Sequence, residues 1–172
     1  MTTLGGEPTS HWKIAILTAS DKASKSEKID SSADVIKKQV GDHQLGEIVD
    51  YRIVPDELDQ IAAALVDMAD EQCADLIFTT GGTGFSPRDV TPEATLQVIE
   101  RQAPGLAEAM RMASMQITRR AMLSRGVAGI RGRTLIINLP GSPKAVKEHT
   151  DAVIDQLPHA LQILTGKQTD HA

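Results

Sequence analysis

The sequence of 172 residues is poor in cysteine and lacks long apolar runs. Its one cysteine, Cys73, excludes an internal disulfide and has no Cys or His partner at metal-ligand spacing. Because Cys73 lies just before a predicted strand, we interpret it as a buried structural thiol. No apolar run of about 18 residues occurs, so we expect no membrane span. The polar segment Met1 to Ser10 lacks the basic-then-apolar order of a signal peptide, which indicates a cytoplasmic protein.

Aromatic residues are also scarce, and negative charges outnumber positive ones. Aromatic side chains make up 2% of the chain, and Phe85 alone lies in a predicted ligand loop, so a planar ligand would rest on Phe85, aliphatic side chains or peptide planes. The net charge of −5 argues against nucleic acid as the main partner, because such binding demands a basic face. A small anionic ligand in a local positive pocket remains compatible with this charge.

The order of apolar segments predicts one α/β domain. Buried strands are expected at 13–18, 48–54, 75–80 and 134–139, and helices at 31–40, 56–69, 92–101, 104–117 and 142–166, the last interrupted by Pro158. The runs 127–130 and 134–139 flank a turn and predict a hairpin. We therefore expect a three-layer fold over 12–166, with a mostly parallel sheet and helices on both faces. Residues 1–11 and 167–172 are expected to be tails.

One stretch, 79–93, stands out between a buried strand and a helix start at which Thr91 can act as the cap. Its glycines permit positive φ and let backbone N–H groups approach an anion closely. It is not a P-loop, because no Gly-Lys-Ser/Thr follows, and Pro87 occupies the place of the third glycine of a dinucleotide fingerprint. A tight turn and a phosphate-binding loop both fit the glycines. Arg88 and Asp89 favour the phosphate-binding loop, since a turn needs neither.

Four loops follow the carboxyl ends of predicted parallel strands, where ligands bind in such sheets. We expect these loops to meet at one edge of the sheet. They are Ser20-Asp21, Pro55-Asp56, Gly81 to Asp89, and Pro140 to Lys144.

Each charged residue of these loops has a plain interpretation and a functional one. Asp56 taken alone is more simply an N-cap. Asp89 is free if Thr91 caps the helix, and a carboxylate beside a phosphate loop suggests Mg²⁺, which Asp21 could join unless it makes an Asx-turn. Arg88 could hold a phosphate or pair with Glu93. Lys144 indicates a nearby anion or is simply exposed. The histidines share no metal-binding spacing, so we interpret them as solvated or structural.

Several motifs resemble one known family. These motifs are Ala15 to Asp21, Val54-Pro55-Asp56-Glu57, Thr80-Gly81-Gly82-Thr83-Gly84, Pro87 to Ala94, Ala121 to Arg125, and Ile136 to Pro143. Through them the chain resembles the molybdopterin-binding proteins of molybdenum-cofactor biosynthesis, and within them molybdopterin adenylyltransferases, from about Lys13 to Gly166.

The resemblance implies a homotrimer that transfers AMP from ATP to molybdopterin with Mg²⁺ and releases pyrophosphate. It implies catalytic and tentative Mg²⁺-binding roles for Asp56 and Asp89, which now favours function over a cap at Asp56, and a possible hand-over to a molybdenum-insertion protein. The candidate substrate-binding residues are Ser20, Asp21, Thr80, Gly81, Gly82, Thr83, Gly84, Arg88, Ser124, Pro140, Gly141 and Ser142. The alternatives are a non-catalytic molybdopterin carrier of the B-type subgroup and a trimeric scaffold; both aspartates favour the enzyme.

Overall fold

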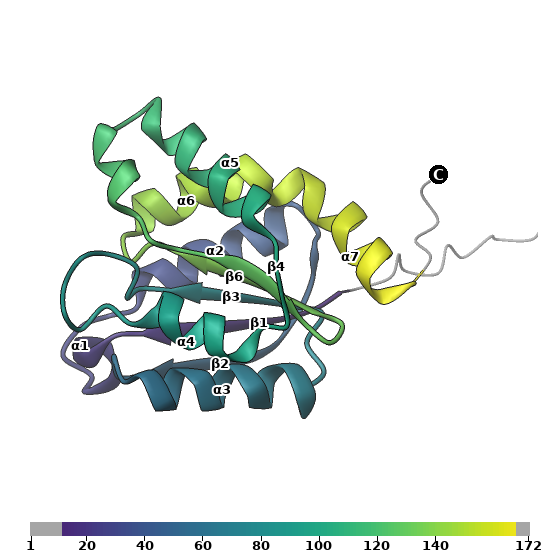
Figure 1. Cartoon of the computed structure of the whole chain (residues 1–172), viewed down its shortest axis with the longest axis horizontal. Coiled ribbons are helices and arrows are strands. Elements are labelled where there is room, and N and C mark those ends of the chain that lie inside the picture. Colours follow the sequence, from purple (N-terminus) through teal and green to yellow (C-terminus); the bar gives the residue numbers. More distant parts are fainter. Residues whose placement is uncertain (1–11, 168–172) are drawn as a thin grey trace, which may run out of the picture.

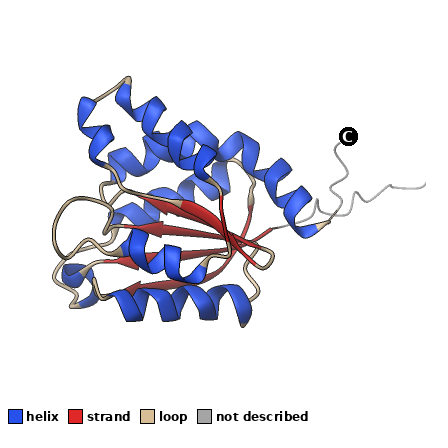
Figure 2. Cartoon of the chain, in the orientation of Figure 1, coloured by secondary structure: helices blue, strands red, loops and turns tan. Residues whose placement is uncertain are grey.

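The computed structural model describes residues 12–167, so the predicted tail 1–11 and residues 168–172 lie outside the described part. Six strands form one sheet in the order β2-β1-β3-β6-β5-β4. The strands of this sheet are red in Figure 2. The parallel part consists of β2 (Gly46–Val54), β1 (Trp12–Ala19), β3 (Leu76–Thr80) and β6 (Thr134–Leu139). The antiparallel edge consists of β5 (Ala128–Arg131) and β4 (Arg101–Gln102). The predicted mostly parallel sheet and the β5–β6 hairpin are confirmed.

Helices cover both faces of this sheet, as expected for a three-layer α/β fold (Figure 1). One face packs against α3 (Leu58–Asp70) and α4 (Thr91–Val98), and the other against α2 (Ser31–Asp42), α5 (Pro104–Met115), α6 (Pro143–Val153) and α7 (Leu157–Thr165). Successive strand residues alternate between the two cores, so β1 and β3 are buried on both sides. This burial on both sides explains why their sequences are nearly continuously apolar.

Several helix starts differ from the sequence prediction in which residue holds the cap position. The helix predicted at 31–40 begins at Ser31 as expected, and Asp30 caps it, since its Oδ1 accepts a bond from the Ala33 N–H at 3.1 Å. The predicted cap role of Thr91 is wrong: Thr91 is the first residue of α4, its Oγ1 is buried, and Val90 holds the cap position. Asp56 is no cap either, because Glu57 precedes α3.

Three segments expected to be loops or helix contain other elements. The loop after β1 holds the short helix α1 (Asp21–Ser24), and the connector before Gly126 includes the 3-10 helix η1 (Arg119–Leu123). The helix predicted to reach Arg101 ends at Val98, because the chain turns there to form β4. The interruption near Pro158 is confirmed by the 3-10 helix η2 (Ile154–Gln156), which separates α6 from α7.

Cys73 is exposed, so the prediction of a buried thiol is wrong. It lies in the turn between α3 and β3 with a φ of 53°, in the left-handed region. The turn carries its side chain outward, although the strand that follows is buried. Across residues 12–167, the structure holds no helix long and apolar enough to cross a membrane.

Candidate functional site

The four predicted loops meet at the carboxyl edge of the parallel strands, as expected. The Ser20 N–H donates to the Val54 carbonyl at 2.9 Å, which joins the ends of β1 and β2. Thr80 Oγ1 donates to the Pro140 carbonyl at 2.6 Å, which joins the ends of β3 and β6. These bonds connect segments far apart in the chain and fix the loops against one another.

Two pockets adjoin the glycine loop, and the loop residues divide between them. The first pocket, of about 220 Å³, is lined from the loop by Gly81 and Gly82. The second, of about 250 Å³, is lined from the same loop by Thr83 and Gly84. The first is framed by loops and by the start of α2, whereas the second lies among α5, η1 and α6. A single loop can therefore contact two neighbouring ligands.

Two glycines of the loop have no room for a side chain. Gly81 has a φ of 91°, and a Cβ there would lie 2.3 Å from the Ala19 carbonyl oxygen. Gly82 has a φ of 66°, and its Cβ would lie 2.3 Å from Thr91 Oγ1 and 3.4 Å from Asp56 Oδ1. Positive φ is costly for any other residue, so glycine at both positions is a requirement of the loop.

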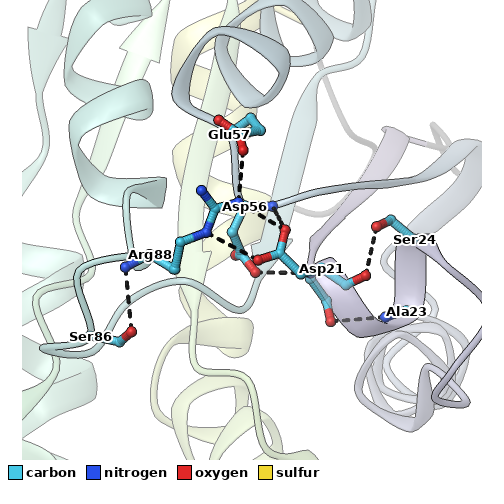
Figure 3. A network of polar contacts seen from close by, with 8 residues as sticks. Asp21, Ala23, Ser24, Asp56, Glu57, Ser86 and Arg88 are labelled. Carbon is cyan, nitrogen blue, oxygen red and sulfur yellow. Dashed lines mark hydrogen bonds and ion pairs between the residues drawn. The ribbon is translucent and has the colours of Figure 1, made fainter.

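Asp21 and Asp56 bind each other's backbone in a reciprocal arrangement (Figure 3). The Asp21 N–H donates to Asp56 Oδ2 at 2.9 Å, and the Asp56 N–H donates to Asp21 Oδ1 at 3.0 Å. Arg88 reaches across from the glycine loop, forms two bonds of 3.0 and 3.1 Å to the Asp21 carboxylate, and donates to Glu57 at 2.7 Å. The bonds from Arg88 hold the pKa of Asp21 below its usual value. Arg88 thus pairs with these two carboxylates and not with Glu93.

Among these carboxylates, Asp56 has an environment that disfavours its negative charge. Burial raises the pKa of its carboxyl, and the nearby negative charges of Asp21 and Asp89 raise it further. Its Oδ1 is buried and has no hydrogen-bond partner among residues 12–167. A buried carboxylate oxygen without a donor is costly, which points to a cation or donor that completes it.

Magnesium fits this part of the site. The residues described form no cluster of three or more His, Cys, Asp or Glu that could hold a metal unaided. Mg²⁺, however, is commonly held by one or two carboxylates together with substrate phosphates and water. Asp56 and Asp89 both line the first pocket beside Gly82, and the unpartnered oxygen of Asp56 supplies a free ligand atom.

Asp89 is held in place rather than free. Its Oδ2 accepts a bond from the Ser86 N–H at 3.0 Å. Arg125 fixes the same loop from outside: Nε donates to the Gly84 carbonyl at 2.8 Å, and Nη2 donates to the Asp89 carbonyl at 2.7 Å. Arg125 also pairs with Glu93 at the start of α4. These bonds set the position of Asp89 relative to the glycines.

The structure brings most of the predicted site residues to the two pockets. The first pocket takes Ser20, Asp56, Thr80, Gly81, Gly82, Asp89 and Gly141. The second takes Thr83, Gly84, Ser124 and Pro140. Asp21 and Arg88 form the adjoining network, whereas Ser142 caps α6 by accepting from the Ala145 N–H. Which of these residues contact substrate stays a prediction.

Sequence reasoning missed residues on neighbouring helices and on the loop before α2. The first pocket also includes Lys28 and Asp30 from that loop and Ser32 from α2, and the second includes Ser114, Glu148 and His149 from α5 and α6. His149 is buried, and its desolvation lowers the pKa of the imidazole. Lys144 stands out in the sequence, and Glu148 lies four residues further along the same helix. Because residues four apart share a helix face, this spacing could have indicated the α6 residues of the second pocket.

Comparison with known proteins identifies the family. Residues 15–159 match the family model described as "Probable molybdopterin binding domain". The chain belongs to this family. Molybdopterin adenylyltransferase of Helicobacter pylori strain J99 is 44% identical over 154 residues, which cover 89% of this chain and 88% of that protein.

Solved structures agree with this assignment. The molybdopterin biosynthesis enzyme MoaB of Thermus thermophilus shares 49% identity with a TM-score of 0.86, covering 91% of this chain and 98% of that one. The Mog protein of Mycobacterium ulcerans shares 37% identity with a TM-score of 0.84, covering 92% and 99%. The predicted molybdopterin-binding fold is thereby confirmed.

Proposed function

We propose that this protein is a molybdopterin adenylyltransferase, which transfers AMP from ATP to molybdopterin in molybdenum-cofactor biosynthesis. The observation that carries the proposal is the glycine loop, which lines one pocket with Gly81 and Gly82 and a second with Thr83 and Gly84. A transferase for two substrates needs such adjoining pockets. The relatives named molybdopterin adenylyltransferase support this activity.

The reaction requires no nucleophile from the protein. An oxygen of the terminal phosphate of molybdopterin attacks the α-phosphorus of ATP and forms a new phosphoanhydride bond. The bond from the α-phosphorus to the oxygen that bridges it to the β-phosphate breaks, and pyrophosphate leaves with that electron pair. Catalysis of this kind depends on alignment of the phosphates and on compensation of their negative charge.

The chain's own groups meet these two needs. The backbone of Gly81 and Gly82 offers the close approach that phosphates require, and Asp21, Arg88 and Arg125 hold the loops rigidly around it. Asp56 and Asp89 would hold Mg²⁺, which supplies charge neutralisation at the phosphates when bound. Asp56 gains a partner for its buried oxygen in this arrangement.

We further infer a homotrimer in the cytoplasm, where ATP is available. The family resemblance suggests the trimer, and several apolar side chains are exposed on α5, on η1 and on the short segment between them: Met112, Met115, Ile117, Met122 and Leu123. An exposed group of this kind on a globular domain favours contact with another chain. Sedimentation should give three times the mass of one chain at micromolar concentration; a single-chain mass would contradict the trimer.

We also infer that a molybdenum-insertion protein takes over the adenylylated product of the reaction.

The direct test of function is pyrophosphate release by the purified protein. We expect release only when ATP, Mg²⁺ and molybdopterin are all present. A molybdopterin carrier would instead bind the pterin and release no pyrophosphate, and a scaffold would bind neither substrate. Either result would reject the proposed activity.

A further inference from the structure

The charged side chains that line the first pocket are mostly carboxylates. Three of them, Asp30, Asp56 and Asp89, face a single cationic residue of the described lining, Lys28. Lys28 is exposed and forms no ion pair with any residue in 12–167. A pocket that is to hold a triphosphate needs positive charge, and Lys28 is the lining side chain that can supply it.

The two arginines nearest the glycine loop are already paired. Arg88 binds the carboxylates of Asp21 and Glu57. Arg125 binds Glu93 and two carbonyls of the loop. These bonds hold the loops together, so neither guanidinium is available to a phosphate without loss of a protein contact. The lysine before α2 has no such contact to give up.

The loop that carries Lys28 is fixed on both sides of it. On one side, the Glu27 N–H donates to a carbonyl of α1 at 2.9 Å. On the other, Asp30 Oδ2 accepts from the Thr18 and Tyr51 hydroxyls, each at 2.5 Å. The backbone at Lys28 is therefore held at the pocket although its side chain is exposed. A group held in this way loses less entropy when a ligand binds.

We propose that Lys28 binds the β- and γ-phosphates of ATP, the part that leaves as pyrophosphate. This inference rests on the proposed function. For AMP transfer the α-phosphorus must lie beside the pterin phosphate, near the glycine loop that both pockets share. The segment 28–32 lines the first pocket, and none of it is among the residues of 12–167 that line the second. Lys28 thus faces the part of ATP remote from the pterin, where a cation selects phosphate over the uncharged adenosine.

The chemistry of the transfer gives this contact a catalytic role. As the bond from the α-phosphorus to the bridging oxygen breaks, its electron pair stays with pyrophosphate and negative charge accumulates there. The Lys28 ammonium donates hydrogen bonds to these oxygens, and its attraction for them grows as the charge develops. The rate of transfer and the affinity for ATP should both depend on Lys28.

The test compares ATP with AMP in the absence of molybdopterin, so that no transfer occurs. Lys28→Gln removes the charge but keeps most of the side-chain length. In titration calorimetry with Mg²⁺ at low salt, it should weaken ATP and pyrophosphate about tenfold and change AMP by less than about twofold. Lys28→Arg should restore most of the ATP affinity. With molybdopterin present, kcat of Lys28→Gln should fall by about tenfold.

A matched control separates phosphate binding from a structural role. Lys22→Gln removes another exposed lysine, on α1, that does not line the first pocket, and it should bind ATP and AMP like the wild type. The melting temperature of Lys28→Gln should equal that of the wild type, because the exposed Lys28 side chain has no ion pair within 12–167. High salt should reduce the difference between wild type and Lys28→Gln.

The outcomes distinguish this inference from the proposed function. Equal losses of ATP and AMP affinity in Lys28→Gln, or no loss of ATP affinity, overturn the inference even if AMP transfer is observed. A loss confined to ATP and pyrophosphate, in a protein that releases no pyrophosphate with both substrates present, upholds the contact of Lys28 and rejects the transferase.

Discussion

Asp56→Asn should stabilise the protein while it abolishes most of the activity. The wild-type carboxylate has a buried, unpartnered oxygen and lies near the charges of Asp21 and Asp89. The amide keeps an oxygen that can accept from the Asp21 N–H, and it removes the buried charge. Removal of a negative charge that is partly buried and close to two other carboxylates contributes about 1 kcal/mol. For a domain of this size the melting temperature should rise by roughly 2–4 °C.

The pH dependence of this gain follows from the direction of the pKa shift. Because the pKa of Asp56 is raised in the folded state, the wild type is destabilised above that pKa and regains stability as the pH falls through it. The advantage of Asp56→Asn should therefore be full at pH 7 and should shrink on acidification. Calorimetry without Mg²⁺ or nucleotide, at several pH values, measures this directly.

Activity should move in the opposite direction. Loss of one electrostatic contact of about 3 kcal/mol corresponds to a fall in transfer rate of about 100-fold. The control is Asp42→Asn, an exposed aspartate paired with Lys38 on α2, which should change neither property strongly. A less stable Asp56→Asn, or one with full activity, would refute the reasoning about this carboxylate.

Three further substitutions probe the same site. Asp89→Asn should retain molybdopterin binding but lose about 100-fold in transfer and show weaker Mg²⁺ dependence of ATP binding, measured by titration calorimetry; full activity would make Asp89 a loop-shaping residue. Gly82→Val should block nucleotide binding, because its Cβ would lie 2.3 Å from Thr91 Oγ1 at positive φ; unchanged affinity in a folded variant would contradict close approach. Arg125→Ala should free the Gly84 and Asp89 carbonyls and lower the transfer rate more than ATP affinity, whereas equal losses of both would point to general unfolding.

The fold could be predicted because its signals are local. Parallel strands buried on both faces are nearly continuously apolar, so the pattern of apolar residues along the sequence predicts β1, β3 and β6. The topology rule then placed the four loops together at one edge, although they are distant in sequence. The predictions of helix caps failed where a tertiary contact determined the position of a side chain that the local sequence rule treats as free. Thr91 was expected to cap its helix, but its hydroxyl is buried against Gly82.

The electrostatic state of the site could not be predicted in the same way. Asp56 looks like a cap in sequence, and its partners at Asp21 and Asp89 lie 35 and 33 residues away. Arg125 belongs to a recognisable motif, but its bonds to Gly84 and Asp89 appear only once η1 packs beside the loop. Glu148 gives no sequence signal beyond its helix, because burial and lack of donors are properties of the folded pocket.

The most direct test of AMP transfer uses ATP labelled at a known phosphorus. With wild-type protein, Mg²⁺ and molybdopterin, label at the α-phosphorus should move to a pterin product, and label at the γ-phosphorus should leave in pyrophosphate. Omission of molybdopterin should leave both labels in ATP. If the protein binds molybdopterin but the α-label stays in ATP, the chain is a pterin-binding protein without transferase activity.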